Sequence, residues 1–261
     1  MRFFRLTIAY DGAGLVGWQR QASGISIQGL LEAAAGALVG HDVAVTGAGR
    51  TDAGVHALGQ VASVSLDRDI DAATLTRALN FRLPSQVRVV EAVEVEASFH
   101  ARFDARGKTY RYHVWNGPVV PPTHRAFVWH VPLPELDVEA MNQAAHLLEG
   151  CHDFAAFQSL GTELSTTERV VFSSAVRTVG AAADTGLAAG LSASAGTLIA
   201  YEVSGSGFLR HMVRSVAGTL IDIGRGRRDA GWMLEVLSSK DRARAGQTAP
   251  AEGLFLVRVV Y

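Results

Sequence analysis

The sequence predicts a mixed α/β protein built from two halves that share one order of elements. Each half has the order strand, helix, strand, strand, helix, strand. Segments with apolar residues every three or four positions indicate amphipathic helices, and segments of alternating polarity indicate strands. The chain has 261 residues, of which 48% are hydrophobic and 19% charged, so it can form one large globular domain or two ordinary ones.

The first half has clear helix boundaries. Ser26 can cap the first helix and Gly40 can end it, while Asp71 can cap the second helix and Pro84 stops it. The apolar residues of the first helix form a single stripe. The predicted elements are a strand at 2–10, a helix at 27–39, strands at 41–46 and 59–66, a helix at 72–82 and a strand at 87–95.

The second half has longer loops. A helix follows Asp137 and ends at Gly150, and the segment 180–196, rich in Ala, Gly, Ser and Thr, is predicted as a hairpin or surface loop. The other predicted elements are strands at 108–115, 170–179 and 198–204, a long helix at 208–223, a short helix at 230–237 and a strand at 254–261.

These two halves predict two ferredoxin-like βαββαβ domains, at residues 1–105 and 106–261, with adjoining antiparallel sheets and a cleft between them.

Composition excludes several classes of protein. No apolar run approaches the ~20 residues of a membrane helix, and Arg5 and Asp11 make the N-terminal segment a poor secretory signal. The single cysteine, Cys151, can form neither an internal disulfide nor a multi-cysteine zinc site, which fits a reducing cytoplasm. The net charge of −1 argues mildly against nucleic-acid binding, although charge distribution matters more than the sum.

A glycine-rich segment, 12–17, matches the G-x-G-x-x-G pattern of dinucleotide-binding proteins. That mechanism requires the third glycine to open a helix, so that the pyrophosphate meets the helix N-terminus. Here seven residues from Trp18 to Gly24 intervene before any helical pattern. We therefore interpret these glycines as shaping a polar loop, with no nicotinamide or flavin cofactor.

A second glycine-rich segment, 47–57, lies between two predicted strands and contains Arg50 and Asp52. Small residues at 47–49 and 53 leave room for a large flat group to approach the backbone. Arg50 and Asp52 are two apart, so in an extended stretch they point the same way. Local chemistry alone leaves open a simple turn in which Asp52 accepts backbone N–H groups.

The segment Gly49-Arg50-Thr51-Asp52-Ala53-Gly54-Val55-His56-Ala57 resembles the catalytic motif of TruA-type pseudouridine synthases. Further stretches resemble other motifs of that family, in the family's order and across most of the chain. They are Tyr10-Asp11-Gly12 with Gly17–Gln21, Phe99–Arg102 with Lys108–Tyr112, Gly150–Phe154 and Phe208–Arg214. The resemblance is far more specific than any one motif.

This resemblance implies an isomerase that converts uridines at positions 38, 39 and 40 of the tRNA anticodon stem-loop to pseudouridine. It implies Asp52 as the nucleophile, since a carboxylate can form a covalent intermediate. Arg214 matches the family's active-site arginine, which lowers the cost of burying that charge. Tyr110 matches the active-site tyrosine and would stack on the uracil.

The remaining expectations concern the RNA. Arg50 could fill the space left by a flipped nucleotide. Substrate contacts are expected from Tyr110, Arg50, His56, Arg20, His100, Arg102 and Lys108, in an RNA-binding cleft. The histidines show no metal-ligand spacing, so neither a metal nor another cofactor is expected. The family is homodimeric, so one tRNA could contact two subunits.

Two alternatives remain at this level. A non-catalytic protein with two RNA-binding ferredoxin-like domains would lack the nucleophile, although no RNP-type run of aromatics and glycines is found. A metal-dependent hydrolase using Asp11, Asp52 and His56 would lose activity with a chelator, whereas a synthase would be indifferent.

Overall fold

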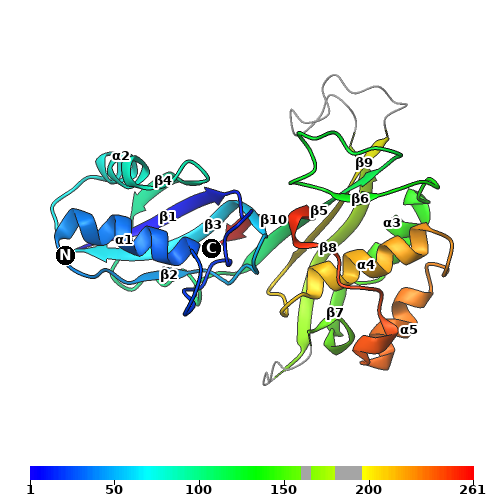
Figure 1. Cartoon of the computed structure of the whole chain (residues 1–261). Helices are drawn as coiled ribbons and strands as arrows, with labels where there is room; N and C mark the ends of the chain where they lie inside the picture. The colour runs from blue at the N-terminus through cyan, green and yellow to red at the C-terminus, as the bar shows by residue number, and fades with distance from the viewer. Residues whose placement is uncertain (160–165, 180–195) are drawn as a thin grey trace. The chain divides into compact units, whose positions relative to one another are not determined.

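The computed structural model describes residues 1–159, 166–179 and 196–261. These residues contain ten strands and five α-helices, so the predicted mixed α/β class is confirmed (Figure 1). They form two compact units, unit 1 with Met1–Lys108 and Phe255–Tyr261, and unit 2 with Thr109–Leu254. The chain thus leaves unit 1 after Lys108, whereas the sequence predicts a boundary after residue 105. The loop predicted at 180–196 lies outside the described residues except for Gly196.

The sheet of unit 1 has the strand order β4-β1-β3-β10, and β2 also pairs with β3. β1 lies between β3 and β4 and is antiparallel to both. Alternate residues of β1, Phe4, Leu6 and Ile8, are buried, as a strand with one covered face requires. The strands are β1 (Arg2–Tyr10), β2 (Val45–Gly47), β3 (His56–Leu66), β4 (Val87–Glu94) and β10 (Leu254–Val260).

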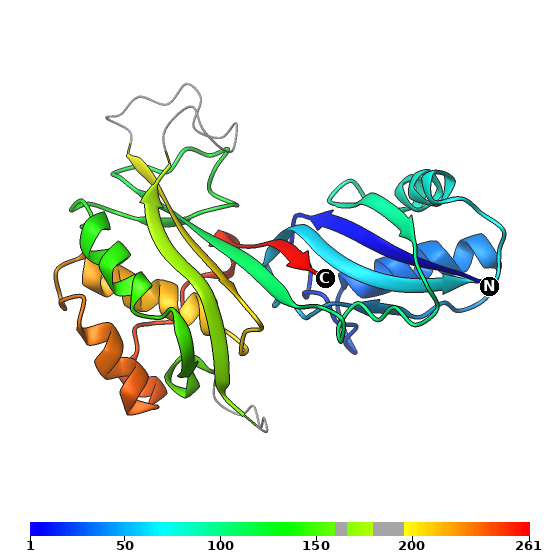
Figure 2. The same cartoon turned by 180° about the vertical axis from the view of Figure 1, so that it is seen from behind.

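Two helices cover one face of this sheet, α1 (Ile27–Val39) and α2 (Ala72–Arg82), and they contact each other (Figures 1 and 2). The caps are those that the sequence predicts. The Ser26 hydroxyl accepts a hydrogen bond from the Gly29 N–H, and the Asp71 carboxylate accepts one from the Thr74 N–H. Gly40 ends α1 in the left-handed conformation, at φ 86°.

The last strand, β10, belongs to unit 1 from Phe255 onward, although the sequence places it in the second half. β10 runs parallel to β3, with Phe255 opposite His56 and Leu256 opposite Ala57. Just beyond it, the Tyr261 hydroxyl donates to the Ala101 carbonyl at 2.7 Å. Both contacts join segments that are far apart in the sequence. Periodicity therefore predicts the strand but cannot assign it to unit 1.

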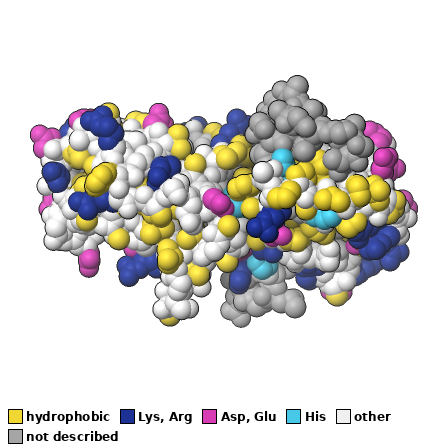
Figure 3. All heavy atoms as spheres, turned by 45° about the horizontal axis from the view of Figure 1, so that its top comes forward, with side chains coloured by type: hydrophobic (Ala, Val, Ile, Leu, Met, Phe, Trp, Pro, Cys, Tyr) yellow, Lys and Arg dark blue, Asp and Glu magenta, His cyan; other side chains and the backbone are white. Residues whose placement is uncertain are grey.

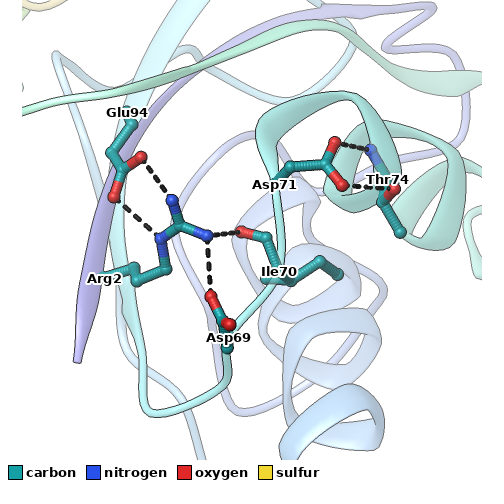
Figure 4. A network of polar contacts seen from close by, with 6 residues as sticks. All are labelled: Arg2, Asp69, Ile70, Asp71, Thr74 and Glu94. Atoms are coloured by element: carbon teal, nitrogen blue, oxygen red, sulfur yellow. Dashed lines mark hydrogen bonds and ion pairs between the residues drawn. The ribbon is translucent and has the colours of Figure 1, made fainter.

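An exposed polar network joins the start of β1 to the loop before α2 (Figure 4). The Arg2 guanidinium binds both carboxylate oxygens of Glu94 and also reaches Asp69 and the Ile70 carbonyl. The hydrogen bond and charge of Arg2 hold the pKa of Glu94 below its usual value. Because exposed ion pairs contribute little stability, we assign this network to fixing the edge of the sheet.

Unit 2 has the strand order β5-β9-β8-β7, and β6 pairs in parallel with β5. The β7–β8 and β8–β9 pairs are antiparallel. The parallel pairs, here and at β10, depart from the purely antiparallel sheets that the sequence predicts. The strands are β5 (Gly107–Asn116), β6 (Trp129–Val131), β7 (Gly150–Asp153), β8 (Glu168–Thr178) and β9 (Thr197–Gly205).

The helices of unit 2 are α3 (Val138–His146), α4 (Met212–Gly224) and α5 (Trp232–Ser239), with 3₁₀ turns at Ala155–Phe157, Arg242–Arg244 and Ala251–Gly253. α4 begins four residues later than the predicted start at 208, because His211 adopts the left-handed conformation with φ 63°. Nearly all of α4 is buried, and a Cβ at Gly218 would lie 1.8 Å from the Gln247 carbonyl oxygen. Residues 245–250 therefore pack directly on this helix. No described helix is both long and apolar enough to span a membrane.

Candidate active site

The motif around Asp52 links the end of β2 to the start of β3. Arg50 is exposed and Asp52 is half-buried, whereas Thr51 between them is 7% exposed. The Asp52 carbonyl accepts a hydrogen bond from the Val55 N–H at 3.2 Å, which closes a turn, and Gly54 takes a left-handed φ of 78°. The two polar side chains thus reach the surface on either side of a buried anchor.

Thr51 is that anchor. Its hydroxyl lies 2.8 Å from the Tyr10 hydroxyl, at the end of β1, and its carbonyl accepts from the Trp18 N–H at 3.1 Å. Burial raises the pKa of Tyr10 to about 12, so its phenol stays protonated at neutral pH. The backbone next to Asp52 is therefore held from both sides.

The glycines of the N-terminal segment pack against this loop. A Cβ at Gly12 would lie 2.2 Å from the Val55 carbonyl oxygen, and a Cβ at Gly17 would lie 2.4 Å from that of Thr51. Gly17 also has a positive φ of 96°. The first and last glycines of the G-x-G-x-x-G pattern are thus explained by close approach of two backbones. The helix that follows begins only at Ile27.

The small residues before Asp52 accommodate the protein's own side chains. A Cβ at Gly47 would lie 2.4 Å from the Trp18 indole, and one at Gly49 would lie 2.8 Å from the Lys108 Nζ atom. The sequence-based interpretation, room for a flat substrate group, is wrong at these two glycines. Their lack of a side chain is required by packing inside unit 1.

Two side chains hold backbone carbonyls of the same segment. The Gln60 amide donates to the Gly49 carbonyl at 3.0 Å, and the Lys108 ammonium donates to the Ala48 carbonyl at 2.8 Å. Burial lowers the pKa of Lys108, and the nearby charge of Arg102 lowers it further. Lys108 thus has a partner within the protein, which the expectation of a phosphate contact did not include.

His56 is turned into the fold. It is 1% exposed, its ring stacks on Phe255 at 4.8 Å, and its Nδ1 lies 3.0 Å from the Gly12 nitrogen and 3.1 Å from the Asp11 Oδ1. At this burial the ring offers no surface for the substrate contact expected from the sequence. It instead ties the catalytic-motif segment to the N-terminal segment.

The other candidate RNA contacts of unit 1 lie at the surface. The Arg20 guanidinium is 3.2 Å from Glu32, and Arg102 is exposed with its guanidinium 5.7 Å from the Phe103 ring. The Nδ1 of His100 accepts hydrogen bonds from the N–H groups of Arg102 and Phe103, which fixes a turn. Basic side chains on the face drawn in Figure 3 are interspersed with acidic and apolar ones.

Tyr110 and Arg214 belong to unit 2. Tyr110, on β5, is 8% exposed and meets the Phe208 ring edge-on at 5.1 Å. Arg214, on α4, donates from Nε to the Ala249 carbonyl at 2.7 Å, and its own carbonyl accepts from the Ala249 N–H. The Tyr112 hydroxyl donates to the neighbouring Pro250 carbonyl. No local pattern in the sequence indicates that residues 249–250 support this arginine.

Within residues 1–159, 166–179 and 196–261, no group of three or more His, Cys, Asp or Glu side chains is placed to hold a metal ion. Asp11 and His56, two members of the hydrolase alternative, contact each other through the His56 Nδ1.

Comparison with known proteins identifies the family. The model of a family described as tRNA pseudouridine synthase matches residues 7–104 and 144–261. A tRNA pseudouridine synthase A of Myxococcus xanthus is 45% identical over 98% of this chain and 91% of its own length. Proteins of the same name from Pelobacter propionicus and Ruminiclostridium cellulolyticum are 42% and 40% identical over the full length of both chains. The chain belongs to the tRNA pseudouridine synthase family.

Proposed function

We propose that this chain isomerises uridine to pseudouridine in tRNA, at positions 38, 39 and 40 of the anticodon stem-loop. The observation that carries the proposal is the motif loop, on which Asp52 is half-buried beside the anchored Thr51. Membership of the family supports the reaction and the tRNA substrate. The positions in the tRNA rest on the resemblance of the ordered motifs.

Asp52 acts as the nucleophile. In the overall reaction the C1′–N1 bond breaks, a C1′–C5 bond forms, N1 gains a proton and C5 loses one. A carboxylate can hold the intermediate covalently, which divides a difficult step into two easier ones. The loop geometry supports this role because Tyr10 and Trp18 anchor Thr51, the residue beside Asp52, through its hydroxyl and its carbonyl.

Tyr110 and Arg214 take part in the same reaction. Tyr110 supplies an aromatic face for the uracil and assists loss of the C5 proton. Arg214 supplies a cation that favours the ionised form of the nucleophile. Its hydrogen bond to the Ala249 carbonyl supports the role, because it uses Nε and fixes the direction of the guanidinium.

RNA phosphates are bound by Arg20, His100 and Arg102, whose side chains reach the surface of unit 1. Each unit is a variant of the ferredoxin-like fold, which the order β4-β1-β3 with β2 on β3 supports for unit 1. The working form is a cytoplasmic homodimer in which both subunits contact one tRNA. A dimer would also assemble enough positive charge from chains that are near neutrality.

Arg50→Ala is expected to lower the single-turnover rate on whole tRNA by about tenfold or more, because Arg50 fills the space left by the flipped nucleotide. The loss should shrink on a stem-loop whose target base is mismatched, since flipping then costs less. Tritium release on both substrates measures this. Arg77→Ala, an exposed arginine on α2, is the control. Normal activity of Arg50→Ala on whole tRNA would contradict the role.

The reaction itself is tested by release of tritium from unmodified tRNA carrying 5-tritiated uridine. The wild-type protein should release it with or without a chelator, because the C5 proton leaves only when a carbon bond forms there. Substrates with single tritiated positions then identify the target uridines. If folded protein binds the tRNA and releases no tritium, the enzyme assignment fails and RNA binding without catalysis replaces it.

A further inference from the structure

Lys108 is a half-buried cation that lacks an acidic partner. It is one of only two lysines in the chain, and the described residues place no carboxylate within 4.0 Å of its ammonium. The charge of Arg102 lies near enough to lower the pKa of Lys108 further. Transferring a cation from water into this half-buried site costs free energy. The presence of a lysine at position 108 therefore requires a specific explanation.

The contact that Lys108 makes is with the loop that carries Asp52. Its ammonium donates to the Ala48 carbonyl at 2.8 Å. The backbone N–H of Ala48 in turn donates to the Val61 carbonyl at 2.7 Å. Ala48 is fully buried, and Gly49 leaves the space into which the ammonium fits. Lys108 therefore fixes the point from which the loop leaves the sheet.

Lys108 completes a set of three anchors on backbone carbonyls of the loop between Ala48 and Thr51. Lys108 holds the Ala48 carbonyl, the Gln60 amide holds that of Gly49 and the Trp18 N–H holds that of Thr51. We propose that Lys108 is a positioning residue, which orients Asp52 for attack by holding the Ala48 carbonyl and does not bind RNA phosphate. The proposal rests on the function proposed above, with Asp52 as nucleophile.

The two roles predict different kinetics. A nucleophile misplaced by about 1 Å can cost on the order of 100-fold in rate, whereas loss of a phosphate contact weakens binding and flattens its salt dependence. Lys108→Met is therefore expected to lower the single-turnover rate at saturating tRNA by about 10- to 100-fold, with Kd within about twofold and an unchanged salt slope. Lys108→Arg keeps a donor and should restore most of the rate.

The matched control is Lys240→Met, since Lys240 is exposed and pairs with Asp153 at the surface of unit 2. It should match the wild type in rate and affinity. A Lys108→Met protein that turns over normally at saturation, but binds tRNA more weakly with a salt slope reduced by about one, would overturn the proposal. A Lys108→Arg protein as slow as Lys108→Met would also contradict it.

A second measurement uses the wild-type protein and does not depend on folding of a variant. Acylation by an amine-reactive reagent, followed by mass spectrometry, compares Lys108 with Lys240. Lys108 should react at least tenfold more slowly, even though its lowered pKa provides more free amine. Equal rates would show that the ammonium is not held on the Ala48 carbonyl. Because this comparison needs no tRNA, its outcome is separate from failure of the synthase assignment.

Discussion

Asp52→Asn is expected to abolish tritium release from tRNA while leaving tRNA affinity and the unfolding temperature near the wild-type values. The amide has the shape of the carboxylate and lacks its nucleophilicity, so the rate should fall by roughly 1,000-fold or more. The fold should tolerate the change, because the turn at Asp52 is closed by its backbone carbonyl and Thr51 provides the buried anchors. Single-turnover tritium release and filter binding measure the two quantities.

Asp42→Asn is the matched control for this variant. Asp42 is an exposed carboxylate of the same unit, upstream of β2, and its loss should change neither rate nor affinity. The proteins should be prepared from cells that lack their own enzyme of this activity, so that residual release is meaningful. Tritium release by Asp52→Asn at more than a few per cent of the wild-type rate would remove Asp52 from the nucleophile's role.

Gly17→Ala is expected to lower the free energy of unfolding of unit 1 by roughly 3 kcal/mol or more, through backbone strain and overpacking together. Gly17 has a φ of 96°, and the new Cβ would lie 2.4 Å from the Thr51 carbonyl oxygen and 2.9 Å from the Asp52 carbonyl carbon. All these atoms belong to the backbone, which cannot rotate away from the new Cβ as a flexible side chain can. Denaturant unfolding, followed by a probe in unit 1, measures the loss.

Gly14→Ala separates the two contributions. Gly14 also has a positive φ, 74°, but a Cβ there would meet no atom within 4 Å. Only the conformational cost remains, about 1–2 kcal/mol. If both variants lose the same stability, the contact between Gly17 and the Thr51 carbonyl does not constrain the folded protein. A larger loss for Gly17→Ala supports tight packing between the N-terminal segment and the Asp52 loop.

The sequence predicts those elements whose signals are local. α1 and α2 begin and end at the predicted residues, because Ser26 and Asp71 cap them through contacts only three residues away. β6 and β7 have three and four residues, too short for a periodic pattern, so the sequence does not predict them. The late start of α4 depends on the backbone conformation of His211, which no apolar stripe reveals.

The candidate site likewise has features that the sequence predicts and features that it does not. The motif around Asp52 can be found from the order of its residues, but the purpose of its glycines cannot. Gly47 faces Trp18, and Gly49 faces Lys108, which is 59 positions away in the sequence. Likewise, the burial of His56 depends on Phe255, at the other end of the chain. Such contacts between distant segments exist only in the folded protein.

The position of β10 has a consequence for the order in which the protein matures during translation. A ribosome makes Asp52 and its loop early, but the strand that runs beside His56 and Ala57 is made after all of unit 2. Domains generally fold as units while the chain emerges, N-terminal parts first. Until then the start of β3, at His56 and Ala57, lacks its β10 neighbour. Unit 1 is therefore completed last, and a ribosome that stalls within unit 2 leaves an exposed sheet edge of the kind that promotes aggregation.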